Sequence, residues 1–416
     1  MKYEVVGGIP LRGVVKVSGA KNSALKLMAA SLLAETPCTI RNVPDITDVR
    51  TMVGVLTALG ARVETPSAGT LRIDPAGLSG WEPPEHLVRE MRASIQVMGP
   101  LLARFGRVRV RQPGGCDIGP RPIDLHLKGF RALGADIVED RGFIMAVAPK
   151  LYGAEIHLDF PSVGATENIM MAASLADGTT IIRNAAREPE IVDQQNFLNR
   201  LGAMIRGAGT DTIRIVGRKA LSGTEYSVLP DRVETGTFMV AIAITGGDAW
   251  IENCIPEHVQ AVIAKLREAG VKITEEDSRI RVTSGGRPGA VSVRTLPYPG
   301  FPTDMHPQIS ALLSIARGTS VITENIFPNR FRYVEELRRM GADIRLEGRV
   351  AVIEGKERLF ATDVDAPDLR GGAALVLAGL AADGVTKVGN IWHIERGYEN
   401  MAGKLASLGA RITRLA

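Results

Sequence analysis

One loop of the sequence holds a cysteine among residues that favour sharp turns. It reads Pro113-Gly114-Gly115-Cys116-Asp117-Ile118-Gly119-Pro120-Arg121-Pro122, a composition typical of a surface loop able to close over a cleft. The reactivity of a thiol depends on its pKa, which the neighbouring Arg121 would lower and Asp117 would raise. Cys116 is therefore a candidate for chemistry. An ordinary loop thiol is the alternative, which the cysteine alone leaves open.

An aspartate at the start of an expected helix is the second candidate. Asp304 stands in Phe301-Pro302-Thr303-Asp304-Met305, among apolar residues and a proline. Its local sequence favours a simple helix N-cap, because a carboxylate there accepts hydrogen bonds from free backbone N–H groups. The functional alternative is a general base shielded from bulk water.

Basic side chains recur at equivalent places along the chain. Arg121 and Arg396 each lie 13 residues before the glycine of a Leu-Gly-Ala phrase (134 − 121 and 409 − 396), and Arg330 lies 11 before another (341 − 330). At the starts of expected helices stand Lys21, Asn22, Arg92, Arg232, Asp304 and Arg370. Helix N-termini favour anions, and the arginine fork matches carboxylate and phosphate. A lone arginine is more often a solvated surface charge, but the shared register favours convergence of several on an anionic substrate.

The elements that carry these residues belong to a repeated α/β unit. The phrase Leu-Gly-Ala, or a close variant, recurs with its glycine at positions 60, 134, 202, 270, 341 and 409, so successive copies are 74, 68, 68, 71 and 68 residues apart. A fixed period of this kind indicates one supersecondary unit in six copies. In each copy an apolar helix, a β-branched strand and an amphipathic helix lead to the glycine, which suits a helix C-cap, and one or two short strands follow.

The strand before the second helix ends in asparagine in five of the copies, at Asn42, Asn184, Asn253, Asn325 and Asn390. The second copy departs from this pattern. Its strand ends near Gln112, and the loop that follows is a few residues longer and contains Cys116. Function is most visible within one sequence where a repeat departs from its own pattern, so this loop is a leading candidate for a functional segment.

The two ends of the chain predict how the copies divide into domains. Only residues 410–416 follow the last glycine, so the sixth copy lacks its closing strands, and the N-terminal stretch 2–17 supplies strands of that kind. Three copies per domain then give one domain over 21–229 and a second made of 1–20 and 230–416, with a double crossover between them. A single solenoid of six units is the alternative.

Composition limits the class of protein. The 416 residues are 45% hydrophobic and 23% charged, with a net charge of +4 and 5% aromatic residues, which disfavours nucleic acid as a partner. No apolar run reaches the length of a membrane span, and the N-terminus does not resemble a signal peptide. Three scattered cysteines favour a reducing cytoplasm over a disulfide framework, and none of the six histidines shows metal-ligand spacing.

Several stretches in order along the chain resemble one family, the UDP-N-acetylglucosamine 1-carboxyvinyltransferases, which are enolpyruvyl transferases. The matching stretches are 18–22 (Ser-Gly-Ala-Lys-Asn), 91–94 (Met-Arg-Ala-Ser), 113–126, 162–166 (Ser-Val-Gly-Ala-Thr), 229–232 (Leu-Pro-Asp-Arg), 301–305, 329–331 (Asn-Arg-Phe), 368–370 (Asp-Leu-Arg) and 393–398 (His-Ile-Glu-Arg-Gly-Tyr). Together they are far more specific than any single short motif.

The resemblance implies an inside-out α/β barrel in each domain, three repeats per barrel, and an active site in the cleft between the domains with the Cys116 loop as lid. It implies transfer of the enolpyruvyl group of phosphoenolpyruvate to the 3′-hydroxyl of UDP-N-acetylglucosamine with release of phosphate, the first committed step of peptidoglycan synthesis. No metal, organic cofactor, nucleic acid or membrane is implied, partner proteins stay unknown, and Cys116 is expected to be alkylated by fosfomycin.

The resemblance also implies roles for individual residues. Cys116 would protonate the methylene carbon of phosphoenolpyruvate, Asp304 would take the proton of the sugar hydroxyl, and Lys21 and Arg396 would complete the catalytic set. Phosphoenolpyruvate would bind Lys21, Asn22, Arg121, Arg370 and Arg396. The nucleotide sugar would bind Asn22, Arg92, Arg121, Pro122, Ile123, Asp124, Leu125, Ser162, Val163, Asp304 and Ile326.

Two departures from the family pattern and two rival functions remain. Some relatives carry a lysine before Ser162, where this chain has Phe160-Pro161, so we expect a basic contact to the diphosphate to be missing. Asp117 stands where the family commonly has alanine. One rival is an enolpyruvyl transferase acting on shikimate 3-phosphate, which would not need a lid cysteine. The other is a non-catalytic repeat protein or nucleic-acid-binding relative, against which the low aromatic content already counts.

Overall fold

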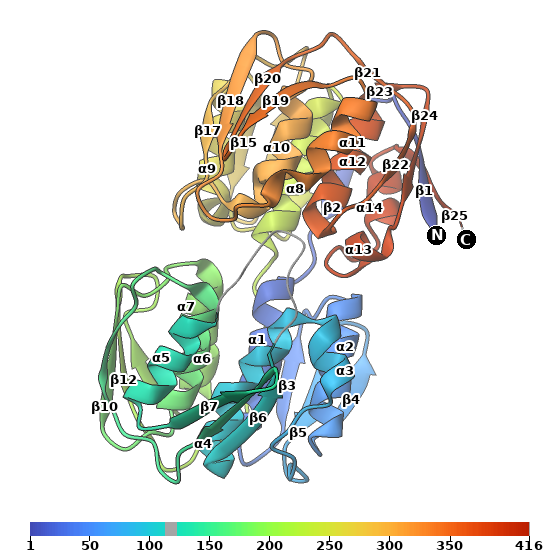
Figure 1. Cartoon of the computed structure of the whole chain (residues 1–416). Helices are drawn as coiled ribbons and strands as arrows, with labels where there is room; N and C mark the ends of the chain where they lie inside the picture. Colours follow the sequence, from blue (N-terminus) through green and yellow to red (C-terminus); the bar gives the residue numbers. More distant parts are fainter. Residues whose placement is uncertain (113–122, 416) are drawn as a thin grey trace. The chain divides into compact units, whose positions relative to one another are not determined.

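The computed structural model describes residues 1–112 and 123–415, and these fall into two compact units (Figure 1). Unit I comprises the described residues between 19 and 229, and unit II comprises 1–18 together with the residues from 230 onward. Each unit has its own hydrophobic core. Cys116, Arg121 and Pro122 lie outside the described residues.

Unit I contains three copies of the α/β unit. Its helices are α1 (Lys21–Ala30), η1 (Ser31–Leu33), α2 (Thr47–Ala58), α3 (Glu85–Glu90), η2 (Arg92–Val97), α4 (Met98–Phe105), α5 (Asp124–Ala132), α6 (Val163–Ala173) and α7 (Pro189–Arg200). Its strands are β3 (Cys38–Arg41), β4 (Arg62–Ser67), β5 (Thr70–Asp74), β6 (Arg107–Arg111), β7 (Asp136–Asp140), β8 (Phe143–Val147), β9 (Glu155–His157), β10 (Thr179–Arg183), β11 (Met204–Arg206), β12 (Thr212–Val216) and β13 (Glu225–Ser227).

Unit II contains the other three copies. Its helices are α8 (Arg232–Ile244), η3 (Pro256–Val259), α9 (Gln260–Glu268), η4 (Thr303–Met305), α10 (His306–Leu313), η5 (Arg330–Tyr333), α11 (Val334–Arg339), α12 (Leu369–Ala381), α13 (Trp392–Glu395) and α14 (Met401–Ser407). Its strands are β1 (Lys2–Val6), β2 (Arg12–Lys16), β14 (Asp248–Glu252), β15 (Lys272–Glu276), β16 (Arg279–Thr283), β17 (Val293–Arg294), β18 (Thr319–Thr323), β19 (Asp343–Glu347), β20 (Val350–Glu354), β21 (Leu359–Phe360), β22 (Asp363–Asp365), β23 (Ala382–Asp383), β24 (Val385–Gly389) and β25 (Arg411–Leu415).

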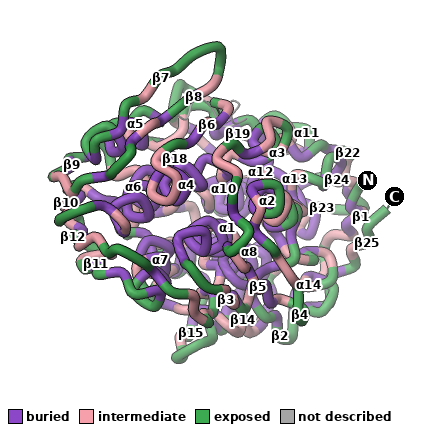
Figure 2. Tube along the Cα trace, turned by 90° about the horizontal axis from the view of Figure 1, so that it is seen from below, coloured by how far each residue is buried: buried purple, intermediate pink, exposed green. Residues whose placement is uncertain are grey.

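The helices that open each copy lie inside and the sheets lie outside. In unit II, α8, α10 and α12 pack against one another and are buried along almost their whole length. In unit I, α4 packs on α6, and α1 packs on η2. Figure 2 shows these helices as buried, whereas strands such as β7, β11 and β15 are largely exposed. The expected inside-out α/β architecture is confirmed, and the described strands form separate small sheets rather than one continuous barrel.

Each four-stranded sheet combines strands of one copy with a strand from another part of the chain, whereas the three-stranded sheet β6-β8-β7 lies within the second copy. In unit I the sheet of the third copy takes β9 from the end of the second, and the sheet of the first takes β13 from the end of the third, both in parallel. In unit II, β17 and β22 pair in the same way with the next copy. The N-terminal β2 pairs in parallel with β14, and β1 lies between β24 and β25.

The repeated glycines and asparagines have backbone conformations that explain their recurrence. All six glycines of the Leu-Gly-Ala phrases have positive φ, from 89° to 103°, as expected of a helix C-cap. Four of the strand-ending asparagines, at 42, 184, 253 and 390, also have positive φ, between 53° and 56°. Asparagine tolerates this left-handed region better than other residues with a side chain.

Four of the asparagine side chains tie their copy to a parallel neighbour. Their Nδ2 atoms donate to a backbone carbonyl just beyond the parallel strand, from Asn42 to Val228 at 2.9 Å and from Asn184 to Leu158 at 2.8 Å. In unit II the same bond runs from Asn253 to Val17 at 2.7 Å and from Asn325 to Thr295 at 3.0 Å. At 42, 184 and 253 the asparagine therefore both turns the chain and holds the end of the neighbouring strand.

Asn184 allows these two contributions to be separated. We expect Asn184→Ala to destabilise unit I by about 1–3 kcal/mol, because it loses the bond to Leu158 and forces a Cβ residue into positive φ. Asn184→Gly loses only the bond, so its urea-unfolding midpoint is expected between those of Asn184→Ala and the unaltered protein. An alanine variant as stable as the unaltered protein would contradict this account.

Candidate active site

Asp304 in unit II is held by two buried arginines. Its Oδ1 accepts a hydrogen bond from Nη2 of Arg330 at 3.0 Å, and its Oδ2 accepts one from Nη2 of Arg370 at 3.2 Å. Arg330 is 2% and Arg370 4% exposed, whereas the side chain of Asp304 is 29% exposed. The carboxylate therefore reaches solvent while its partners are fixed in the protein interior.

The N-cap interpretation of Asp304 is wrong. Asp304 is the second residue of the short helix η4, whose N-cap is Pro302, and no side chain caps that helix. Local sequence favoured the cap because the two arginines that bind the carboxylate lie 26 and 66 residues further along the chain. The observed geometry instead places a carboxyl group at the edge of a buried pair of arginines.

Arg370 is fixed at the N-terminus of α12. Asp368 caps this helix by accepting hydrogen bonds from the N–H groups of Arg370 and Gly371. The guanidinium lies 5.3 Å from the ring centre of Tyr398. Burial lowers the pKa of Arg370, but Tyr398 and Asp304 raise it by more, so its pKa lies above the usual arginine range. Arg370 is a permanent cation beside Asp304.

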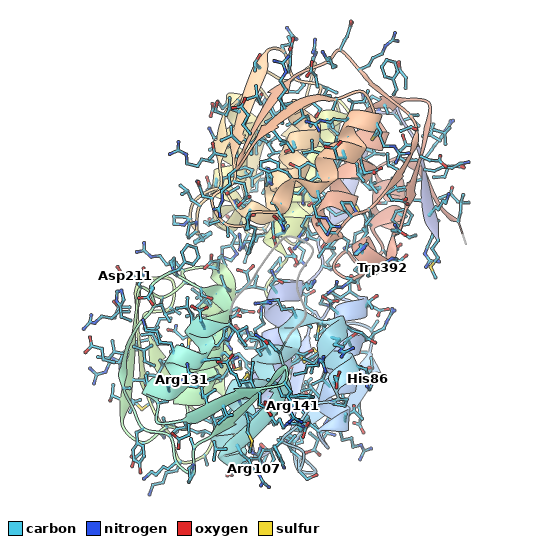
Figure 3. All side chains as sticks on the ribbon, in the orientation of Figure 1. His86, Arg107, Arg131, Arg141, Asp211 and Trp392 are labelled. Atoms are coloured by element: carbon cyan, nitrogen blue, oxygen red, sulfur yellow. The ribbon has the colours of Figure 1, made fainter. Side chains whose placement is uncertain are left out.

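The buried arginines differ from those on the outer surface. Arg131 on α5 and Arg141 in the turn between β7 and β8 are exposed (Figure 3). These two side chains are surface charges exposed to solvent. An arginine is almost never buried unless it is paired with an acidic group. The burial of Arg330 and Arg370 beside Asp304 therefore indicates a charged cluster that the fold holds in place. Arg396 is half-buried at the C-cap of α13.

In unit I the candidate residues stand at helix starts. Lys21 is the first residue of α1, and its Nζ lies 2.6 Å from Oδ2 of Asp48 in the first turn of α2. Asn22 follows it, and Arg92 begins η2. Ile123 precedes α5, whose first residues are Asp124 and Leu125. Ser162 caps α6 by accepting from the N–H of Ala165 at 3.3 Å, and Val163 begins that helix.

The segments η2 and α5 both contact the first turn of α6. Gln96 of η2 donates from Nε2 to the carbonyl oxygen of Gly164 at 3.1 Å. A Cβ added to Gly164 would lie 3.2 Å from Gln96 and from the ring of His126 in α5, so a larger residue there would press on both side chains. The predicted nucleotide-sugar residues at positions 92, 123–125 and 162–163 are therefore carried by segments that contact one another. Backbone N–H groups at such helix starts favour anions.

Glu167 joins α1 to this group from within the core. Its Oε2 lies 3.3 Å from Nζ of Lys26, which also donates to the carbonyl oxygen of Asn22 at 2.8 Å. Burial raises the pKa of Glu167 to about 7; Lys26 lowers it, and Glu190 and Glu188 raise it further. Glu167 could not be recognised from the sequence, because it looks like an ordinary polar residue in an otherwise apolar helix.

Within the described residues, no cluster of three or more His, Cys, Asp and Glu side chains could hold a metal ion. None of the helices in this part of the chain is both long and apolar enough to cross a membrane. Cys38 and Cys254 are free and buried.

Comparison with known proteins first defines the class. Residues 5–405 match the model of the EPSP synthase (3-phosphoshikimate 1-carboxyvinyltransferase) family, and the chain belongs to that family. Solved structures agree. The enolpyruvyl transferase NikO from Streptomyces tendae superposes with a TM-score of 0.90 at 25% identity, covering 99% of this chain and 98% of that one. EPSP synthase from Acinetobacter baumannii has a TM-score of 0.78 at 19% identity, covers 100% of both chains, and shows the shared two-domain fold.

More similar relatives have a narrower name. UDP-N-acetylglucosamine 1-carboxyvinyltransferase 1 of Caldanaerobacter subterraneus subsp. tengcongensis is 56% identical over 413 residues, which are 99% of each chain. The enzyme of the same name from Carboxydothermus hydrogenoformans is 56% identical over 414 residues, covering 100% of this chain and 98% of the relative. The likeness therefore extends along both units.

The raised pKa of Glu167 predicts a pH-dependent stability. Its ordinary pKa is 4.5, so between pH 4.5 and about 7 the folded protein keeps a proton that the unfolded chain loses, and stability falls as the pH rises through this window. In Glu167→Gln this titration is absent. We expect the stability of the variant relative to the unaltered protein to increase with pH across the window, by at most about 1.4 kcal/mol per pH unit. Urea unfolding at a series of pH values measures the difference, and a difference independent of pH would refute the prediction.

Proposed function

We propose that this chain transfers the 1-carboxyvinyl group of phosphoenolpyruvate to the 3′-hydroxyl of UDP-N-acetylglucosamine and releases phosphate, the first committed step of peptidoglycan synthesis. The observation that carries the proposal is the 56% identity, over the whole chain, to enzymes named for this transfer. The buried arginine pair around Asp304 supports it, since the reaction needs a base and fixed cations for two anionic substrates.

The proposed reaction begins with proton transfer to carbon. The Cys116 thiol gives its proton to the methylene carbon of phosphoenolpyruvate, which makes the adjacent C2 an oxocarbenium-like centre. The 3′-hydroxyl oxygen attacks C2 while Asp304 takes the hydroxyl proton, and a tetrahedral ketal forms. The phosphate then leaves with the proton that Asp304 had taken, and a methyl proton returns to the Cys116 thiolate, which restores the double bond, the carboxylate and the thiol. No electron acceptor, metal or organic cofactor enters this balance.

The cations would hold the phosphate and carboxylate groups. The proposed contacts to phosphoenolpyruvate are Lys21, Asn22, Arg121, Arg370 and Arg396. Arg370 donates to Oδ2 of Asp304. An anion that draws this guanidinium away would leave Oδ2 of Asp304 open to the sugar hydroxyl, so substrate binding itself would prepare the base.

The nucleotide sugar would bind the helix starts of unit I and the loop at Ile326. The proposed contacts are Asn22, Arg92, Arg121, Pro122, Ile123, Asp124, Leu125, Ser162, Val163, Asp304 and Ile326. We also propose that 21–229 and 1–20 with 230–416 are the two domains, and that the enzyme works in the cytoplasm, in keeping with its few cysteines.

Phosphate release tests the reaction. With phosphoenolpyruvate and UDP-N-acetylglucosamine together, we expect release by the unaltered protein, none with either substrate alone, and loss of at least about 10²-fold in Cys116→Ala and Asp304→Asn. Release that persists in Cys116→Ala would remove the assigned acid, and no release under any condition would remove the function.

The family name provides a second candidate substrate, shikimate 3-phosphate. If this were the acceptor, it would replace UDP-N-acetylglucosamine in the phosphate-release assay. We expect no release with shikimate 3-phosphate at concentrations that saturate with the nucleotide sugar. Turnover with shikimate 3-phosphate alone as acceptor would favour the rival.

Alkylation tests the cysteine independently of turnover. Fosfomycin, an epoxide that mimics phosphoenolpyruvate, is expected to label Cys116 and to leave the buried Cys38 and Cys254 unmodified. Peptide mass spectrometry identifies the labelled residue. Labelling at another cysteine, or none, would count against the lid role.

A further inference from the structure

Glu324 is a buried carboxylate that none of the sequence patterns described above indicates. It follows directly after β18, where its backbone N–H donates to the carbonyl oxygen of Arg349 at 2.9 Å, and its side chain is 0% exposed. Burying a carboxylate is costly unless hydrogen-bond donors surround it. Its partners therefore identify what the carboxylate holds in place.

One oxygen of Glu324 fixes the loop after β18. Oε1 accepts hydrogen bonds from the backbone N–H groups of Ile326 at 2.7 Å and Phe327 at 3.0 Å. It also accepts one from Oγ1 of Thr295 at 2.9 Å. Ile326 is one of the proposed contacts to the nucleotide sugar, so this oxygen sets the position of a substrate-binding loop.

The other oxygen fixes the segment that carries Asp304. Oε2 accepts a hydrogen bond from Oγ1 of Thr303 at 2.9 Å and lies 3.5 Å from Nδ1 of His306. Burial, with Arg330 nearby, lowers the pKa of His306 well below its usual range, so the imidazole is neutral. Thr303 and His306 stand on either side of Asp304 in the chain. Glu324 therefore holds one flank of the proposed base by a hydrogen bond to Thr303 and lies close to the other at His306.

We infer that Glu324 is a positioning residue for the proposed transfer, which holds Asp304 through Thr303 and the Ile326 loop through its other oxygen. This role deepens the proposed function and rests on it. Because the two segments use different oxygens, a change at one of them affects one substrate-related property and spares the other. A residue needed only for folding would not separate the two properties.

Three substitutions test this separation. Thr303→Val removes only the hydrogen bond to Oε2 of Glu324. We expect kcat to fall on the order of 10-fold, because a small displacement of a catalytic base is costly. The KM for UDP-N-acetylglucosamine is expected to stay within about twofold of the value for the unaltered protein. Glu324→Ala removes both sets of bonds, so kcat is expected to fall and this KM to rise. Glu324→Gln keeps an oxygen for the three donors at Oε1 and is expected to restore the KM.

Glu252→Gln is the matched control, because Glu252 precedes Asn253 as Glu324 precedes Asn325 and is only half-buried. Its kcat and KM are expected to be unchanged. An unchanged kcat in Thr303→Val, or a KM in Glu324→Gln as high as in Glu324→Ala, would overturn the inference. If Glu324→Ala does not fold, Thr303→Val and Glu324→Gln decide. Absence of phosphate release by the unaltered protein would instead overturn the proposed function, and this role with it.

Discussion

The rest of this structure depends on borrowed strands, which are the parallel strands that a sheet takes from another part of the chain. Among the described residues, the five four-stranded sheets each include a parallel strand from another part of the chain, while the second copy has the three-stranded sheet β6-β8-β7 of its own. A two-stranded hairpin is marginal by itself, so the added strand contributes to the stability of the sheets that take it. In unit I, β13 returns from the third copy to the first. In unit II, β2 does the same for the fourth copy. The helices that open the copies are then enclosed.

This arrangement explains where the candidate residues stand. Helices such as α6, α8 and α12 end in apolar stretches, so their polar side chains lie in the first half of the helix and in the loops that precede it. Ser162, Asp231 and Asp368 cap those three helices. The repeat thus presents several helix N-termini at equivalent places, and Arg370 extends from one of them toward Asp304.

The sequence predicts features that depend on local backbone conformation. The glycines at period 70 and the strand-ending asparagines are visible because left-handed φ restricts the residue type, and the six copies follow from them. Contacts between distant segments are not visible in this way. The N-cap interpretation of Asp304 failed because its arginines lie 26 and 66 residues further along the chain, Arg370 in the next copy. Glu324 was not found because its four partners lie in three separate segments. The resemblance supplied the residue roles that neither periodicity nor composition could.

The borrowed strands also set the order in which the chain can become stable during synthesis. Unit I has all of its strands once residue 227, the end of β13, has been made. In unit II the first two strands synthesised, β1 and β2, find their partners only in β14, β24 and β25, the last of which ends at Leu415. The nascent chain therefore carries an unpaired N-terminal strand until β24 and β25 have been made, and its two halves become resistant to unfolding at different times.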